Sequence, residues 1–236
     1  MASNFGKTIQ VSTFGASHGY AIGGIVEGLP CGHTIDIDEL QAFLKRRAPG
    51  QNQLQTQRKE ADIPEFLSGM VDGMLSGSPL AFMIRNTSQH SGDYNNLRDI
   101  PRPSHADFTA RMRYGDKVDM RGGGHFSARL TAPLCVAGGI ALQLLREKGI
   151  EIHGHLKQVG TIQDTPIDMV HPDMKALREI ATEPIAMLDA DKRSEVENLV
   201  MKLKKDGDST GGIVEVVATG LPIGLGNPNF DGIENR

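Results

Sequence analysis

Alternating polar and β-prone residues open the chain, and a helical pattern follows them. Residues 7–14 alternate with a period of two, which predicts a strand. Residues 23–29 form a second apolar run that predicts another strand. Residues 36–47 predict a helix, because Asp36 or Asp38 can cap its first turn and basic residues fill its last turn, where the helix dipole favours them. This part of the chain therefore predicts two strands and one helix.

The rest of the chain mixes short strands, loops and helices. A long helix is predicted because apolar residues recur there at helical spacing, and its small residues at 137–139 allow close packing against another helix. The predicted bounds are two short strands around a turn at 76–79 within 64–84, a loop at 86–104, a helical turn at 106–114, the long helix at 127–148, a strand at 150–161, a helix at 192–205 and a strand at 212–221.

A short internal echo suggests two related halves. The sequence of residues 23–27 recurs at 211–215, and each copy is followed by Gly-Leu-Pro, at 28–30 and 220–222. The first copy leads into the predicted helix at 36–47, whereas the chain stops soon after the second. A match this short also arises by chance, but if the copies are structural repeats, the chain ends where a matching helix would begin. We therefore expect a chain that is truncated at its C-terminus.

Composition indicates an ordinary soluble protein with 39% hydrophobic and 23% charged residues. The net charge of -4 gives no reason to expect a nucleic-acid partner. We see no signal peptide and no run near about 18 apolar residues, so we expect no membrane contact and a cytoplasmic location. Cys31 and Cys135 are far apart and not in a metal-type spacing, which argues against a disulfide framework or a cysteine zinc site. We expect no metal.

Two histidine-containing segments stand out. Residues 13–19 place His18 between small residues on a turn after a strand, where we expect it to be exposed and able to act as a general acid. Residues 101–107 use two prolines to fix a loop that presents Arg102 and His105, a pair suited to phosphate or carboxylate. Taken alone, each pattern also fits a solvent-facing side chain without a role.

A glycine-rich segment supplies a third candidate. Residues 119–129 carry three consecutive glycines before the predicted long helix, where exposed backbone N–H groups and the helix dipole favour an anion. Arg121, His125 and Arg129 add positive charge. The arginines at 46–47 close the first helix, where they equally fit simple complementarity to the helix dipole. The crowding of arginines and histidines into 85–129 therefore predicts a local anion site.

Together these segments resemble a known family. FGxSHG, RRxPGQ, an Asp-Tyr before RPxHAD, and DxRGGGxxSAR occur here in that order, as they do in chorismate synthases. Residues 67–84 and the segments GDSTGG and GLPIGLGNPNFD are also similar to that family. The resemblance covers essentially the whole chain.

The resemblance implies a fold and a reaction. It implies an α+β fold, a β-α-β sandwich with pseudo-twofold halves, here a single domain over 1–236 with an incomplete second half. It implies 1,4-anti elimination of phosphate from 5-enolpyruvylshikimate 3-phosphate, a small anionic substrate, to give chorismate. Reduced FMN is the implied cofactor, with NADPH as a candidate reductant, and the full-length form is expected to be a homotetramer.

Residue roles follow from the resemblance by position. The implied substrate contacts are Ser17, Arg47, Arg102 and Arg129. The implied acids are His18 and His105, one for reduced flavin and the other for the departing phosphate. The residues implied to line the flavin are His125, Phe126, Ser127 and Ala128.

This chain departs from the family pattern in ways that remove charge or glycine near the site. The departures are Ala16 for Glu, Ala48 for Arg, Gln53 for Arg, Ser104 for Gly, His125 for Arg and Leu130 for Glu. The family's Asn-His-Ala-Gly-Gly and Gly-Arg-His-Asp-Pro motifs are absent, so we expect this chain to bind FMN poorly and to turn over little. The alternatives are a binding-only homologue that keeps an anion pocket, a structural module and a different flavin enzyme.

Overall fold

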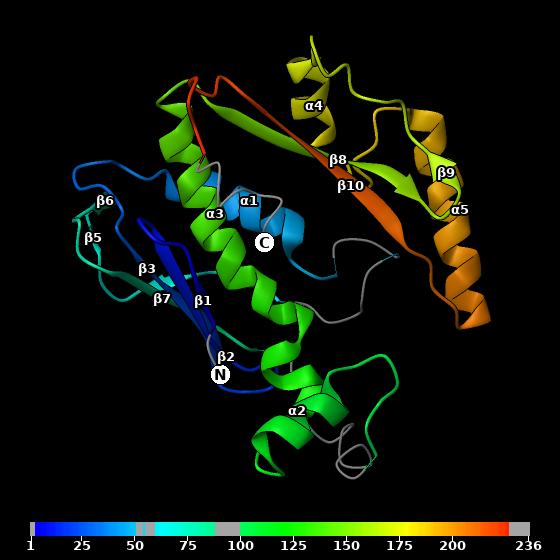
Figure 1. The fold of residues 1–236 in the computed structure, drawn as a ribbon, viewed down its shortest axis with the longest axis horizontal. Helices are drawn as coiled ribbons and strands as arrows, with labels where there is room; N and C mark the ends of the chain where they lie inside the picture. The colour runs from blue at the N-terminus through cyan, green and yellow to red at the C-terminus, as the bar shows by residue number, and fades with distance from the viewer. Residues whose placement is uncertain (1–2, 51–53, 55–59, 88–99, 227–236) are drawn as a thin grey trace. The chain divides into compact units, whose positions relative to one another are not determined.

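The computed structural model describes residues 3–50, 54, 60–87 and 100–226 (Figure 1). These residues belong to two compact units, residues 1–143 and residues 144–236. Each unit is built on an antiparallel sheet with helices, which confirms the α+β class.

A five-stranded antiparallel sheet forms the base of the first unit, in the order β1-β2-β3-β7-β4. A separate hairpin pairs β5 with β6. The strands are β1 (Asn4–Phe5), β2 (Gln10–Gly15), β3 (Ala21–Glu27), β4 (Glu65–Phe66), β5 (Met70–Val71), β6 (Met74–Leu75) and β7 (Leu80–Arg85). The sequence predicted two short strands within 64–84, whereas the structure has four there, β4 to β7.

One face of this sheet carries the core. The buried side chains of Ile22 and Val26 lie opposite Ile84 and Leu80 in the β3–β7 register. Between them, Gly24 leaves room for the ring of Phe82, since a Cβ there would stand 2.8 Å from Phe82 Cζ. Close packing of this kind needs a residue without a side chain in the middle of the strand.

Helix α1 (Ile37–Arg47) has the predicted bounds and cap, because the Asp36 carboxylate accepts the Glu39 amide. Helix α3 (Thr131–Arg146) approaches α1 closely, as the small residues at 137–139 predicted: a Cβ at Gly139 would stand 2.5 Å from Leu40 Cδ1. The backbone of Asp36 and the Gln143 amide also exchange two hydrogen bonds of 2.9 Å. The two helices are therefore joined at both apolar and polar positions.

The polypeptide before α3 is not a regular α-helix. The segment η2 (Arg121–Phe126) holds the three glycines, and a short turn, η3 (Ala128–Leu130), precedes α3. The predicted helical turn at 106–114 is α2 (Asp107–Tyr114), with two turns. The predicted helix at 127–148 thus begins with a 3-10 turn.

Within the described residues, Arg121–Arg146 is long and apolar enough by composition to cross a membrane. However, the glycines interrupt it, and the 16 residues of α3 span about 24 Å, less than the roughly 30 Å of a bilayer core. Ala132, Val136 and Ile140 are fully buried in the protein. We therefore interpret α3 as a core helix.

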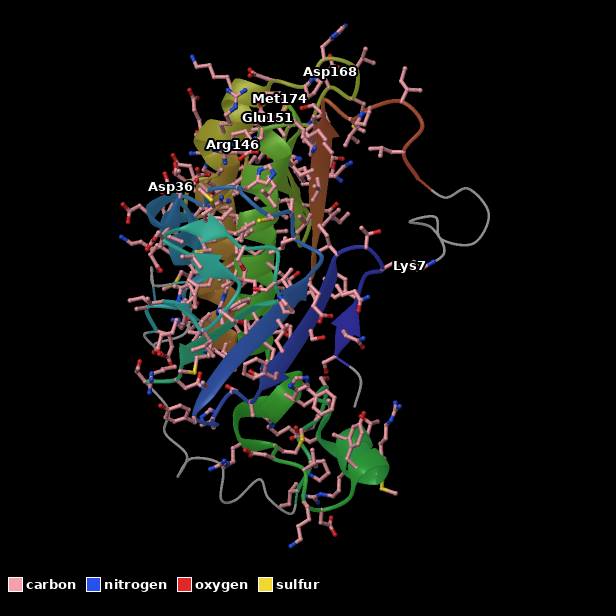
Figure 2. The ribbon with its side chains drawn as sticks, turned by 90° about the vertical axis from the view of Figure 1, so that its left-hand side faces the viewer. Lys7, Asp36, Arg146, Glu151, Asp168 and Met174 are labelled. Carbon is pink, nitrogen blue, oxygen red and sulfur yellow. The ribbon has the colours of Figure 1, made fainter. Side chains whose placement is uncertain are left out.

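The second unit is a three-stranded antiparallel sheet with two helices. The sheet order is β10-β8-β9, and α4 packs on β8. Figure 2 labels Glu151, at the start of β8, and Met174, at the start of α4. The elements are β8 (Glu151–Val159), β9 (Ile162–Gln163), α4 (Met174–Ile180), α5 (Ala190–Asp206) and β10 (Gly212–Thr219). Helix α4 was missed in the sequence, because it is only seven residues long and lies in a stretch rich in proline and polar residues.

The two copies of the sequence echo share a local structure. β3 pairs antiparallel with β2, and β10 pairs antiparallel with β8. Each then ends at a glycine with positive φ, Gly28 and Gly220, where a Cβ would collide with a backbone carbonyl oxygen at 2.1 and 2.0 Å. The echo is therefore explained in part by a strand ending that only glycine permits.

Candidate active site

The glycine loop of η2 adopts a conformation that requires its sequence. Gly122, Gly123 and Gly124 all have positive φ, at 59°, 86° and 56°. Side chains with a Cβ rarely adopt this region, so three in succession need glycine. The carbonyl of Gly124 accepts the amide of Ser17 at 3.0 Å, which joins the loop to the turn that carries His18.

His18 lies against this loop. A Cβ at Gly122 would stand 2.0 Å from His18 Nδ1, so the imidazole occupies the space that the glycine leaves. His18 is only 8% exposed, and the expectation of an exposed side chain was wrong. The turn folds back onto the glycine loop, and a local sequence pattern cannot show that.

His105 meets the same loop at the neighbouring residue. A Cβ at Gly123 would stand 3.7 Å from His105 Cε1 and 3.3 Å from Ser127 Cβ. Unlike His18, His105 is exposed. The structure thus brings both predicted acids to consecutive glycines of one loop.

An acidic residue also lies at the loop. The Asp119 carboxylate accepts hydrogen bonds from Arg121, which lower the pKa of this carboxyl, and the charge of His18 lowers it further. Asp119 therefore stays ionised at the loop, near His18.

Arg102 is held by a bidentate ion pair. Its Nε and Nη2 donate to the two carboxylate oxygens of Asp107 at 2.8 and 3.0 Å, and its backbone N–H donates to the same group. The hydrogen bond from Arg102 lowers the pKa of Asp107 below its ordinary value, against the effect of burial. The fork fixes the plane of the Arg102 guanidinium.

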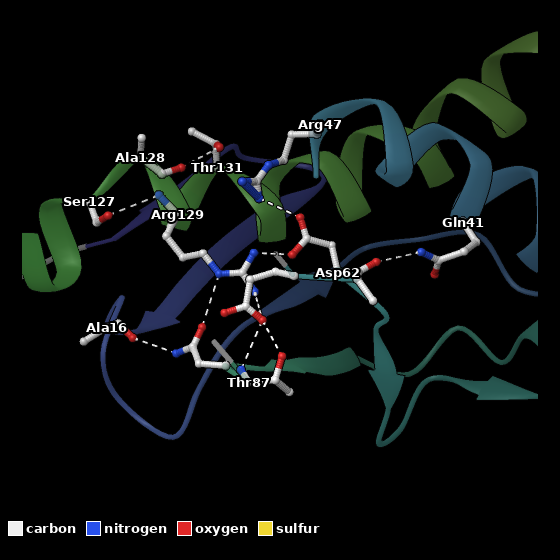
Figure 3. A network of polar contacts seen from close by, with 12 residues as sticks. Ala16, Gln41, Arg47, Asp62, Thr87, Ser127, Ala128, Arg129 and Thr131 are labelled. Atoms are coloured by element: carbon white, nitrogen blue, oxygen red, sulfur yellow. Dashed lines mark hydrogen bonds and ion pairs between the residues drawn. The ribbon is translucent and has the colours of Figure 1, made fainter. Parts of the chain in front are cut away.

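The other two predicted arginines share one carboxylate (Figure 3). Arg47 Nη1 donates to Asp62 Oδ2 at 2.8 Å, and Arg129 Nη1 donates to Asp62 Oδ1. Arg129 is 3% exposed and Arg47 is 20% exposed. Sequence reasoning assigned no role to Asp62. The signal for it was indirect: a buried arginine requires a carboxylate partner.

The segment predicted to line a flavin has two kinds of residue. Both ring nitrogens of His125 are engaged within the protein, Nδ1 with the Gly15 carbonyl at 2.8 Å and Nε2 with Ser3 Oγ at 2.6 Å. In contrast, Phe126 and Ala128 are exposed. The Ser127 hydroxyl accepts the Arg129 amide and caps η3. His125 and Ser127 are half-buried, so the segment combines exposed and partly covered side chains.

The fold and this site define an α+β protein in which two histidines meet a glycine loop and two arginines share one buried carboxylate. Residues 9–236 match the family model of chorismate synthase. Chorismate synthases of Lancefieldella parvula, Ralstonia pickettii and Bacteroides thetaiotaomicron are 44%, 45% and 44% identical to this chain over 100%, 98% and 98% of it. The chain belongs to the chorismate synthase family.

A solved structure agrees with this assignment. A crystal structure of chorismate synthase matches 94% of the chain with a TM-score of 0.68 and 25% identity. The chain spans 64%, 61% and 63% of the length of the three relatives and 60% of the solved chain. The fold and family are thus shown for a chain shorter than its relatives.

Proposed function

We propose that the protein built on this chain is a lyase that eliminates phosphate from 5-enolpyruvylshikimate 3-phosphate to give chorismate. The observation that carries this proposal is the convergence of His18 and His105 on Gly122 and Gly123 in a member of the chorismate synthase family. Elimination of phosphate needs positioned acids close to an anion site. Both proposed acids, His18 and His105, lie at this glycine loop.

The arginines give the site its affinity for a substrate with two carboxylates and a phosphate. Arg47, Arg102 and Arg129 all belong to the first unit, and each is oriented by a carboxylate partner. Guanidinium groups with a fixed plane suit bidentate recognition of carboxylate and phosphate oxygens. In this proposal the partly exposed Arg47 and Arg102 contact the substrate so that the leaving phosphate faces the histidines, and the buried Arg129 holds Arg47 in place through Asp62.

The two histidines differ in their surroundings. His18 is buried near Asp119, and His105 is exposed at Gly123. One delivers a proton to the departing phosphate oxygen, which neutralises the charge that develops there, and the other holds a proton next to the flavin site. Ser17, fixed by its backbone bond to Gly124, adds a hydroxyl at the same turn.

The residues near the loop fit reduced FMN. Phe126 is 39% exposed, and its ring centroid lies 6.3 Å from that of Tyr114. An exposed aromatic surface beside backbone amides suits a flat ring system with a phosphate. Phe126, Ser127 and Ala128 would hold the cofactor. The chemistry that reduced FMN supplies when bound is transient electron donation to the substrate ring, with no net redox change.

The test is phosphate release from 5-enolpyruvylshikimate 3-phosphate, measured anaerobically with dithionite-reduced FMN. The assay uses this chain and a chimera that adds the remaining C-terminal part of the Ralstonia pickettii relative. We expect activity in the chimera that is lost in its His18→Ala and His105→Ala variants. Binding without turnover in both proteins would support the binding-only alternative, and absence of substrate binding would overturn the proposal.

Four accompanying statements stay predictions. They are the cytoplasmic location, the homotetramer, NADPH as the source of electrons, and a single domain over 1–236. Light scattering after size exclusion tests the oligomeric state. Flavin reduction with NADPH alone, without dithionite, tests the reductant.

A further inference from the structure

The Asp62 carboxylate is the centre of a buried polar network in the first unit (Figure 3). Its two oxygens accept from two different arginines, Arg47 and Arg129. The Asp62 side chain is 0% exposed. Since the carboxylate is shared in this way, the two guanidiniums are held at one fixed separation.

Behind Arg129, the network continues into the protein. Arg129 Nε donates to Asn86 Oδ1 at 3.2 Å, and the Asn86 side-chain nitrogen donates to the carbonyls of Ala16 and Gly19 at 3.1 and 2.8 Å. These two carbonyls flank the residues Ser17 and His18. The arginine network and the histidine turn are thus parts of one hydrogen-bonded structure.

A second carboxylate balances the charge. Glu60 is 1% exposed in its side chain, and its Oε2 lies 4.0 Å from Arg129 Nη2. The same oxygen accepts from the amide and the hydroxyl of Thr87 at 3.1 and 2.8 Å. The positive charges of the two guanidiniums are therefore balanced by the negative charges of the two carboxylates. A single buried charge without a partner would be strongly destabilising.

The backbone of Asp62 shows that the surrounding structure imposes this arrangement. Its φ is +50°, in the left-handed region that non-glycine residues rarely adopt. Such strain costs on the order of 1 kcal/mol or more and persists where neighbouring contacts hold it in place. Aspartate and asparagine tolerate this region better than other side chains, so the chain can place a carboxylate here.

The three central side chains of the network differ in burial. The side chains of Arg129 and Asp62 are 3% and 0% exposed, whereas the side chain of Arg47 is 20% exposed. We propose that Asp62, braced by Arg129, is a positioning residue that orients Arg47 toward the anionic substrate. This inference rests on the proposed function. Asp62 contacts no substrate itself; it acts through Arg47.

The test is titration calorimetry of 5-enolpyruvylshikimate 3-phosphate into this chain. Asp62→Asn keeps the size of the side chain and tolerates the same positive φ, but it removes the negative charge. We expect the Kd for the substrate to rise about tenfold or more. A role in folding alone would lower the fraction of chains that bind, and so the stoichiometry, with Kd unchanged. The control is Glu65→Gln, which breaks an exposed pair with Arg85 and should leave Kd unchanged.

A double-mutant cycle shows whether Asp62 acts through Arg47. In an Arg47→Met background, Asp62→Asn should have little further effect on Kd, because the group that it orients is absent. Additive effects of the two changes would overturn the proposal. If Asp62→Asn does not fold, Asp62→Glu replaces it. Its carboxylate is displaced by one methylene, so we expect weaker substrate binding. A Kd for Asp62→Glu equal to that of the unmodified chain would show that only the balance of charge is needed.

Failure of this inference and failure of the proposed function give different results. If the unmodified chain does not bind the substrate, the proposed function fails and the inference falls with it. If the unmodified chain binds the substrate and Asp62→Asn binds it equally well, only the inference is overturned.

Discussion

The imidazole of His18 fills the space above Gly122, so that a single methyl group there would stand 2.0 Å from Nδ1. The glycine is needed for its own backbone, with φ at +59°, and also for the position of the histidine. One residue thus links the conformation of the loop to the placement of a proposed acid.

Gly122→Ala should displace His18. In the chimera we expect phosphate release to fall about a hundredfold or more, because a displacement of roughly 1 Å at a catalytic group has effects of this size. The His18 ring resonances in an NMR spectrum of this chain should also shift. Gly207→Ala is the matched control, since Gly207 has a similar left-handed backbone, with φ at 68° and ψ at 26°, but a Cβ there meets nothing within 4 Å. Equal losses in both variants would show that backbone strain alone is responsible.

Ser104→Gly should stabilise the protein. Ser104, which stands where the family commonly has glycine, has φ at +58°, and a side chain in this region costs about 1 kcal/mol or more. We expect the melting temperature to rise by a few degrees in a thermal scan. Ser209→Gly, at an exposed serine outside the positive-φ set, should leave the melting temperature unchanged or lower. A lower melting temperature for Ser104→Gly would contradict the prediction.

His125 and Phe126 are adjacent in sequence but should respond differently to removal. His125→Ala removes the hydrogen bonds to Gly15 and Ser3. We expect the free energy of unfolding, measured in urea, to fall by about 1–3 kcal/mol. Phe126→Ala removes exposed aromatic surface and should weaken FMN binding in a fluorescence titration with the chimera. If His125→Ala weakens FMN binding more than Phe126→Ala does, the side chain of His125 is a cofactor contact after all.

The second unit should lose stability in acid through the carboxylates around His155. Hydrogen bonds from Lys157 and His155 lower the pKa of Glu215. Burial alone would raise the pKa of Asp164, but hydrogen bonds from three backbone amides and from His155 outweigh it and lower the pKa. A carboxyl whose folded pKa is lowered stabilises the fold above its unfolded pKa, near 4, and this contribution is lost as the pH falls through the folded value.

Glu215→Gln tests this linkage. The measurement is denaturant titration at several pH values. The free energy of unfolding should be lower for the variant than for the parent chain at pH 7, and this difference should shrink below about pH 4. Glu197→Gln, at an exposed residue of α5, is the control and should change little at either pH. A difference that stays constant from pH 7 to pH 3 would contradict an electrostatic origin.

Several elements were predictable because their signals are local. The bounds of α1 follow from its capping aspartate and its terminal charges, which act over a few residues. The left-handed loop at 122–124 follows from three glycines in a row. The ordered motifs were enough to indicate the family, which the comparisons with known proteins then confirmed. Helix α4 was missed because seven residues carry too little periodicity to be distinguished from a loop.

The sequence by itself determined which residues are the candidates for the chemistry: the histidines, the arginines and the glycine loop. Only the tertiary structure decided their surroundings. It buried His18, tied His125 to the first strands, and paired Arg47 and Arg129 with Asp62. The physical reason is separation along the chain. Charges and ring nitrogens tens of residues apart interact only after strands and helices have packed, and no pattern within a few residues encodes which partner each will meet.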